Sequence, residues 1–272
     1  MKHTLLSSII ISGMSRLIEQ LKRTSLGGPQ AIGFRTGQMG STRPRLPLVA
    51  CLSQEGCGDL AGYSDSIDAA LIPVCGKKSD SVSFRGCSQT LPGISWGGWL
   101  KREGKGKVSL KGIDCDFFVF PLDTPPGVMQ DTEAGKLLAV DSSLVGGGLA
   151  GTVDKLPVDA VLLADKGDKD FSLTCRYLML VHYFAALLTK PFMVRVPVKI
   201  NSYEIALLWE AGADGLLVMV ESARSLGSVR KLRAELDKAE LPSRRKQNAA
   251  RPILPRVGGE RAEEGEEEEE DE

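Results

Sequence analysis

Four carboxylates in this sequence could carry out acid–base or metal chemistry together, because each follows a short apolar run. Asp123, Asp141, Asp165 and Glu221 stand at or just past the last apolar residue of FFVFP, KLLAV, AVLLA and GLLVMV. Carboxylates that converge repel one another unless a cation, a proton or water separates them. We therefore predict catalytic roles for Asp123, Asp141 and Asp165. We also predict a divalent metal such as magnesium on Asp141, Asp165 and Glu221, since oxygen ligands suit a hard cation. The alternative is that each Asp caps the next turn by accepting backbone N–H groups.

Cationic and hydroxyl side chains near the same runs could bind a substrate. Arg195 lies inside the apolar run FMVRV, where a charge must point into the protein interior or be paired. It either acts in catalysis by binding a substrate carboxylate or phosphate, or forms a buried salt bridge with a neighbouring Asp. Lys199 follows this run and Ser222 follows Glu221, and we predict that both bind substrate. No Lys lies inside a convincing strand, so a Schiff-base mechanism has no obvious nucleophile, and Lys199 is the nearest substitute.

The elements that must position these residues are apolar runs that recur about 20 to 30 residues apart, which leaves room for one strand and one crossover. The last five runs are almost continuously apolar, which is typical of parallel strands covered on both faces. The predicted strands are Pro47–Leu52, Ala69–Val74, Gly93–Trp99, Asp116–Pro121, Lys136–Val140, Asp159–Ala164, Phe192–Val196 and Gly215–Val220, with Ala31–Arg35 as a poorer ninth candidate.

The crossovers differ between the two halves of the chain. Helices are predicted over Leu173–Thr189 and Ser202–Ala211, and a last helix, capped by Ser222 or Ser225, runs to about Ala239. The segments 53–66, 75–92 and 101–112 are rich in Gly, Ser and Lys, and we expect at most one helical turn in each. The first half therefore reads as a degenerate copy of the second.

One phrase carries a resemblance to a known fold. Glu210-Ala211-Gly212-Ala213-Asp214-Gly215-Leu216-Leu217-Val218 resembles the joint of many TIM barrels at which a helix ends and a buried strand follows at once. Weaker forms of this joint begin at Gly112 and at Leu156. The resemblance is clearest over residues 110–241 and implies an α/β fold, a partly degenerate (β/α)8 barrel. Its active site would lie at the carboxyl ends of the strands. It identifies a superfold and no particular enzyme family.

The two ends of the chain have distinct compositions. Residues 260–272 carry a formal charge of −9 in a chain whose net charge is −1, and the stretch before them is basic. We predict a barrel over 1–241 and a disordered tail over 242–272, with the acidic end screening the basic part, which makes nucleic acid an unlikely partner. At the other end, Leu17, Ile18 and Leu21 have helical spacing and predict a segment that closes the barrel floor rather than an export signal.

The cysteine content and the length of the apolar stretches predict a cytoplasmic protein. The six cysteines lack metal-site spacing, and with a core of this size we expect free thiols. The apolar stretch from Tyr177 to Leu188 is too short to span a bilayer, so no membrane role is predicted. Trp96 and Trp99 are expected to pack in the core, with stacking on a substrate as the alternative.

Together these features predict a lyase or isomerase that acts on a small anionic metabolite through a rim of carboxylates. The alternative is a barrel without catalysis that serves as a scaffold or binding protein, which the weak first half favours. A homo-oligomer is compatible with either prediction.

Overall fold

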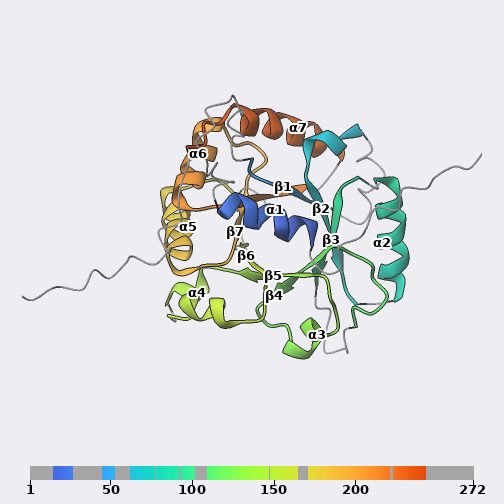
Figure 1. Cartoon of the computed structure of the whole chain (residues 1–272). Helices are drawn as coiled ribbons and strands as arrows, with labels where there is room; N and C mark the ends of the chain where they lie inside the picture. The colour runs from blue at the N-terminus through green and yellow to red at the C-terminus, as the bar shows by residue number, and fades with distance from the viewer. Residues whose placement is uncertain are drawn as a thin grey trace, which may run out of the picture.

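The eight predicted strands form one closed parallel barrel in a computed structural model of the protein (Figure 1). The strands are β1 (Leu48–Leu52), β2 (Ala69–Val74), β3 (Ser95–Leu100), β4 (Phe117–Pro121), β5 (Gly135–Val140), β6 (Ala160–Leu163), β7 (Phe192–Val196) and β8 (Gly215–Val220). Each strand pairs with the next in the chain, and β1 pairs with β8 along its whole length, Leu48–Leu52 opposite Leu216–Val220. The structure describes residues 15–26, 45–52, 62–76, 78–91, 93–101, 109–146, 148–164, 171–220 and 223–242.

Helices surround the barrel, and their lengths are uneven (Figure 1). The long ones that follow strands are α2 (Lys78–Thr90), α5 (Cys175–Leu187), α6 (Ser202–Ala211) and α7 (Ala223–Lys238). The short ones are the 3-10 helices η2 (Ser64–Ser66) and η3 (Ala150–Lys155), with α3 (Pro126–Gln130) and α4 (Ser143–Gly146). Helix α6 begins with a capping box between Asn201 and Glu204 and ends at Gly212, whose φ of 113° confirms the predicted left-handed stop.

The core has two parts, because successive side chains on a strand face opposite sides of the sheet. One set of alternate strand residues, which includes Phe118, packs against helix residues such as Phe184 and Trp209. The other set fills the barrel interior and includes Val49, Leu71 and Phe117.

Aspartates placed just before β2, β6 and β8 tie each of these strands to the preceding strand. The N–H of Phe192 donates to Asp214 Oδ2 at 2.9 Å, and the N–H of Asp214 donates to the Phe192 carbonyl at 2.7 Å. Since each pair satisfies a backbone donor at the start of a strand, it fixes the register of two neighbours and explains the joint that the sequence repeats. The same reciprocal pair joins Asp159 to Lys136 and Asp68 to Leu48.

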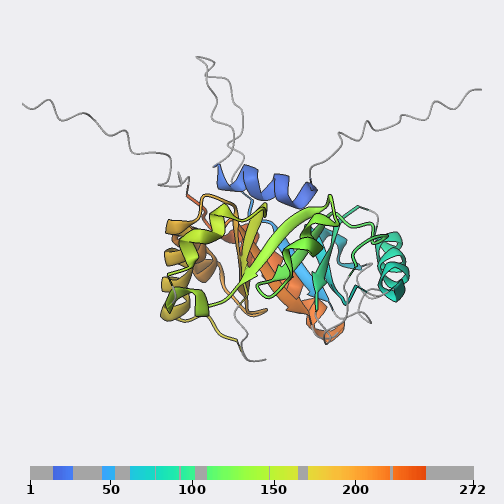
Figure 2. The ribbon, with the colours of Figure 1, turned by 90° about the horizontal axis from the view of Figure 1, so that it is seen from below.

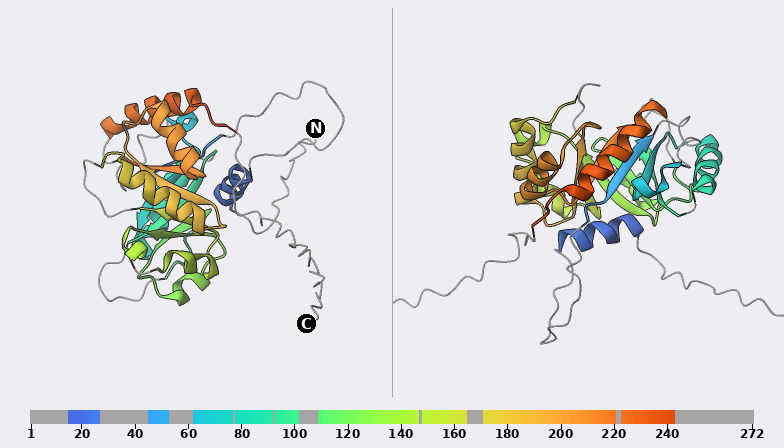
Figure 3. Two further views of the ribbon diagram at one scale, coloured as in Figure 1. Left: turned by 90° about the vertical axis from the view of Figure 1, so that its left-hand side faces the viewer. Right: turned by 90° about the horizontal axis from the view of Figure 1, so that it is seen from above.

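Helix α1 (Arg16–Ser25) lies across one end of the barrel (Figures 2 and 3). Asp116, just before β4, holds its first turn by accepting from Ser15 Oγ at 2.9 Å and from two backbone N–H groups. Leu21 is fully buried, and a Cβ on Gly215, the first residue of β8, would lie 2.6 Å from its side chain. This close approach at a strand start places α1 at the amino-terminal end, which confirms the predicted floor.

Helix α2 corrects the expectation of at most one turn in residues 75–92, because it has thirteen residues. It is stabilised by a few anchors rather than by an apolar stripe. Phe84 is buried and meets Trp96 edge to face, with ring centroids 6.4 Å apart, and Cys87 one turn later is also buried. Packing of this kind overrides weak local propensity.

The start of the last helix and the state of one cysteine bear on three further predictions. Helix α7 begins at Ala223, so Ser225 is not its cap, and Ser222 lies outside the described residues, as does the ninth strand candidate Ala31–Arg35. Cys87 is disulfide-bonded, so the expectation of free thiols throughout is wrong. Sequence spacing did not reveal this bond because it depends on which cysteines the fold brings within bonding distance.

The chain beyond residue 242 lies outside the described part, and the predicted disordered tail with it. The boundary between barrel and tail therefore stays a prediction. The buried indole of Trp209 donates to the Pro242 carbonyl at 2.8 Å, which ties this residue to α6. Among the described helices, none combines the length and the apolar character that crossing a membrane requires.

Candidate functional site

The two ends of the barrel interior differ in exposure. At the amino-terminal end, α1 covers inward-facing residues such as Ala69 and Phe117, which are buried. At the carboxyl end, the inward-facing Ala139, Arg195 and Met219 are only partly buried, so this end opens toward solvent. We call its inward-facing side chains the C-terminal mouth: Cys51, Trp99, Lys101, Ala139, Arg195 and Met219.

Two cations enter the C-terminal mouth from opposite parts of the barrel. Arg195 projects from β7, and its guanidinium carbon lies 5.4 Å from the centre of the Phe171 ring. Lys101 directly follows β3, and its Nζ lies 4.1 Å from the centre of the Trp99 ring. Both are cation–π arrangements, in which the ring face attracts the positive charge. Among the described residues, the mouth thus combines two cations with two aromatic rings.

The thiol of Cys51 lies beneath these cations, on β1. Burial raises its pKa to about 12, and the charges of Lys101 and Arg195 lower it only in part. Burial also lowers the pKa of the Lys101 ammonium; Cys51 opposes this shift and Arg195 adds to it. These mutual effects place the three groups in one electrostatic environment, in which the thiol stays protonated and the lysine gives up its proton more readily than usual.

The two described carboxylates of the predicted rim follow neighbouring strands at the carboxyl end. Asp123 lies in the turn after β4 and is exposed. Asp141 follows β5, and its Oδ1 accepts from the Ser143 N–H at 3.0 Å and from the Ser143 hydroxyl. Asp141 therefore has the hydrogen bonds of a turn cap, the alternative that the sequence left open.

The structure does not bring the other predicted site residues into the mouth or does not describe them. Lys199 follows β7 on an exposed loop. Asp165, Glu221 and Ser222 lie outside the described residues, so two of the three predicted magnesium ligands are not placed. Over the ranges that the structure does describe, no three His, Cys, Asp or Glu side chains are grouped so that they could hold a metal ion.

Lys101 is the site residue that sequence analysis missed. The predicted strand ended at Trp99, whereas β3 continues to Leu100 and the Lys101 N–H still donates to the Val74 carbonyl at 2.8 Å. The available signal was the period of two, since Gly97, Trp99 and Lys101 share one face. Trp96 points the other way and donates its indole N–H to the Leu91 carbonyl at 3.1 Å.

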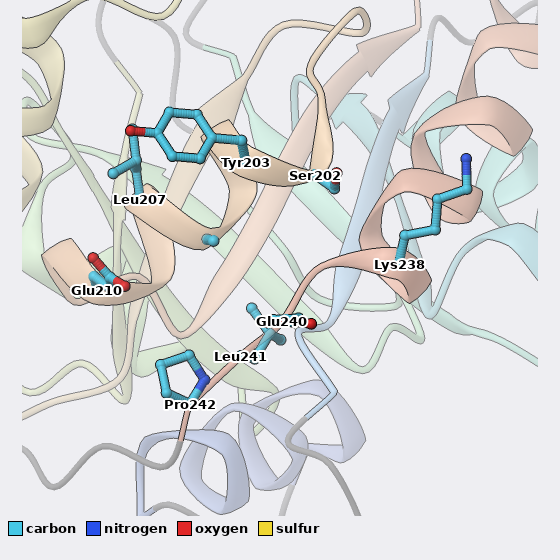
Figure 4. A pocket seen from close by; sticks show the side chains of 9 residues that line it. Ser202, Tyr203, Leu207, Glu210, Lys238, Glu240, Leu241 and Pro242 are labelled. Atoms are coloured by element: carbon cyan, nitrogen blue, oxygen red, sulfur yellow. The ribbon is translucent and has the colours of Figure 1, made fainter.

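A second concave feature lies away from the mouth, between α6 and the end of the described chain (Figure 4). It has a volume of about 750 Å³, and its lining includes Tyr203, Glu210, Lys238 and Leu241. The Lys238 ammonium is already paired with Glu235 at 2.8 Å. This groove lies on the outer helical layer, and no inward-facing residue of the strands lines it.

The strand order, the parallel pairing and the floor helix define the protein as a (β/α)8 TIM barrel. No protein-family model matches the sequence, and no curated protein matches it.

Solved structures with the same fold include three synthases. A tryptophan synthase from Mycobacterium tuberculosis is 15% identical, with a TM-score of 0.56, and the match covers 83% of this chain and 98% of that one. A 3-hexulose-6-phosphate synthase is 16% identical, with a TM-score of 0.51, over 70% and 99% of the two chains. A mutant tryptophan synthase α-subunit from Pyrococcus furiosus is 11% identical, with a TM-score of 0.52, over 71% and 98%. At these identities the likeness concerns the fold alone.

Proposed function

We propose that the protein binds a small anionic metabolite in the C-terminal mouth and converts it as a lyase or isomerase. The observation that carries the proposal is the convergence of Lys101 and Arg195, from β3 and β7, on one partly open end of the barrel. A carboxylate or phosphate accepts strong hydrogen bonds from both cation types, and Arg offers a two-pronged contact.

Binding is tested by thermal unfolding with a panel of anions, namely inorganic phosphate, small carboxylates and sugar phosphates. A ligand at one hundred times its dissociation constant stabilises the folded state by about 2.7 kcal/mol. We expect Arg195→Gln and Lys101→Gln to lose most of the stabilisation that the best anion gives. Lys111→Gln is the matched control, because Lys111 is exposed before β4, at the opposite end of the barrel. Equal stabilisation in all three variants would contradict the site.

Catalysis is the finer part of the proposal, and it depends on a carboxylate that moves a proton. Asp123 is the candidate for this role, because it is exposed in the turn after β4, at the carboxyl end of the barrel. The anion that stabilises the protein best is incubated with it in deuterated water. NMR then follows the exchange of the carbon-bound protons of this anion for deuterium. We expect exchange with the native chain and its loss in Asp123→Asn, with binding retained.

The second candidate function is binding without turnover. It is favoured by the short α-helices in the crossovers after β4 and β5, since α3 and α4 have five and four residues. A barrel of this kind would be stabilised by the anion as above, yet would neither exchange its protons nor consume it.

A further inference from the structure

We infer that Lys101 is an amine nucleophile that forms an imine with the carbonyl group of a small anionic aldehyde or 2-oxo acid, whose anionic group Arg195 binds. The inference rests on the proposed function, since it takes the same mouth and names the substrate class. It also assigns the imine-forming role to Lys101, whereas the sequence had suggested only Lys199 for this role.

The backbone holds Lys101 in place while its side chain reaches into the mouth. Its N–H donates to the Val74 carbonyl at 2.8 Å, which continues the pairing of β3 with β2 past Leu100. Its Nζ lies over the ring of Trp99, which is itself nearly buried in the barrel interior. Lys101 is exposed as a whole residue, and its ammonium lies over the Trp99 ring at the solvent-facing edge of the mouth.

The surroundings of Lys101 make its ammonium lose a proton more readily than an ordinary lysine does, and the neutral amine is the form that attacks a carbonyl. Burial lowers the pKa of its ammonium, and the positive charge of Arg195 acts in the same direction, against the opposing effect of Cys51. A lysine near an apolar surface and a second cation is activated in this way. The Cys51 thiol is not a competing nucleophile, since burial raises its pKa to about 12.

The reaction balances without an added oxidant or reductant. The neutral Nζ forms a bond to the carbonyl carbon, and the carbonyl oxygen takes a proton to become the hydroxyl of a carbinolamine. A proton taken from solvent lets that hydroxyl leave as water, and the second N–H proton returns to solvent, so the net products are the imine and one water molecule. In its protonated form the imine withdraws electrons from the neighbouring carbon, which assists proton removal or carbon–carbon cleavage there.

Arg195 supplies the selectivity for an anionic carbonyl compound. Its guanidinium enters the same mouth from β7, while its own backbone carbonyl accepts from the Tyr177 hydroxyl at 2.8 Å and keeps that strand end in position. A carboxylate held by Arg195 would bring an attached carbonyl toward Lys101. Binding of this kind turns a bimolecular reaction into an effectively intramolecular one.

The test is reductive trapping of the full-length protein with cyanoborohydride and either glyoxylate or acetaldehyde, followed by peptide mass spectrometry. Both aldehydes are small, but only glyoxylate carries a carboxylate. We expect glyoxylate to label Lys101 at least about ten-fold faster than the exposed Lys111, which corresponds to about 1.4 kcal/mol in activation free energy. In Arg195→Gln the glyoxylate labelling should fall to the rate of acetaldehyde labelling.

Lys101→Arg is the variant that separates binding from covalent chemistry. It keeps a cation over Trp99 and cannot form an imine, so it should still be stabilised by anions while the label at position 101 is lost. Labelling of Lys101 no faster than Lys111 with either aldehyde would overturn the nucleophile and leave anion binding standing. Rapid labelling by both aldehydes, independent of Arg195, would overturn the anionic substrate class and with it the proposed binding site.

Discussion

Arg233 on α7 and Asp68, just before β2, form an ion pair with an Nη1–Oδ2 distance of 3.1 Å, although 165 residues separate them in the chain. Both side chains are almost buried, at 7% and 9% exposure. The same carboxylate accepts from the Leu48 N–H at 2.8 Å. The last helix is thereby joined to the pair formed by β1 and β2.

Removing Arg233 should destabilise the fold. Arg233→Met leaves the Asp68 carboxylate with less compensation in a nearly buried position, and we expect the free energy of unfolding to fall by about 3 kcal/mol. Urea denaturation followed by circular dichroism measures this loss. Arg230→Met on the same helix is the control, since Arg230 is exposed and should change stability by less than about 1 kcal/mol. Equal losses in the two variants would contradict a special role for the buried pair.

The aspartate at the start of β8 gives a second stability prediction. Asp214 is fully buried, and Asp214→Ala would leave the Phe192 N–H without its acceptor. The unsatisfied donor should cost about 1 to 3 kcal/mol, whereas Asp214→Asn keeps an acceptor oxygen and should cost less. Thermal unfolding of the two variants compares them, and a larger loss for Asn than for Ala would refute this explanation.

The Cys51 thiol should resist alkylation in the folded protein at any pH well below its raised pKa. Burial disfavours the thiolate and raises the pKa of this thiol to about 12, so it remains protonated at every pH below that value. At pH 8 we expect iodoacetamide to alkylate the exposed Cys175 and to leave Cys51 unmodified in the folded protein. In denaturant both should react. Modification of Cys51 at the same rate as Cys175 in the folded state would show that the thiol is not shielded.

Magnesium binding stays a prediction, since Asp165 and Glu221 lie outside the described residues. If the rim holds the metal, a magnesium concentration one hundred times the dissociation constant should stabilise the protein by about 2.7 kcal/mol. Glu221→Gln should weaken that effect. A melting temperature unchanged by millimolar magnesium or manganese would speak against a metal at this rim.

Much of the fold followed from the sequence because its strands are buried on both faces. A parallel strand of this kind must be apolar along its length, so runs such as FFVFP and GLLVMV marked β4 and β8 directly. The joint around Gly212 and Asp214 was also visible, since a left-handed stop and a strand-tying carboxylate each require a particular residue type. The helix that closes the floor was readable from the spacing of Leu17, Ile18 and Leu21.

Only the tertiary structure decided the rest, because the deciding contacts join residues that are distant in the chain. Helix α2 depends on Phe84 meeting Trp96, a contact that local propensity does not encode. The position of Lys101 in the mouth depends on β3 continuing by one residue beside β2. The electrostatic coupling of Lys101 to Arg195 arises because a closed barrel turns the ends of separate strands toward one axis. Composition sets which segments are buried, whereas closure of the sheet sets which side chains meet.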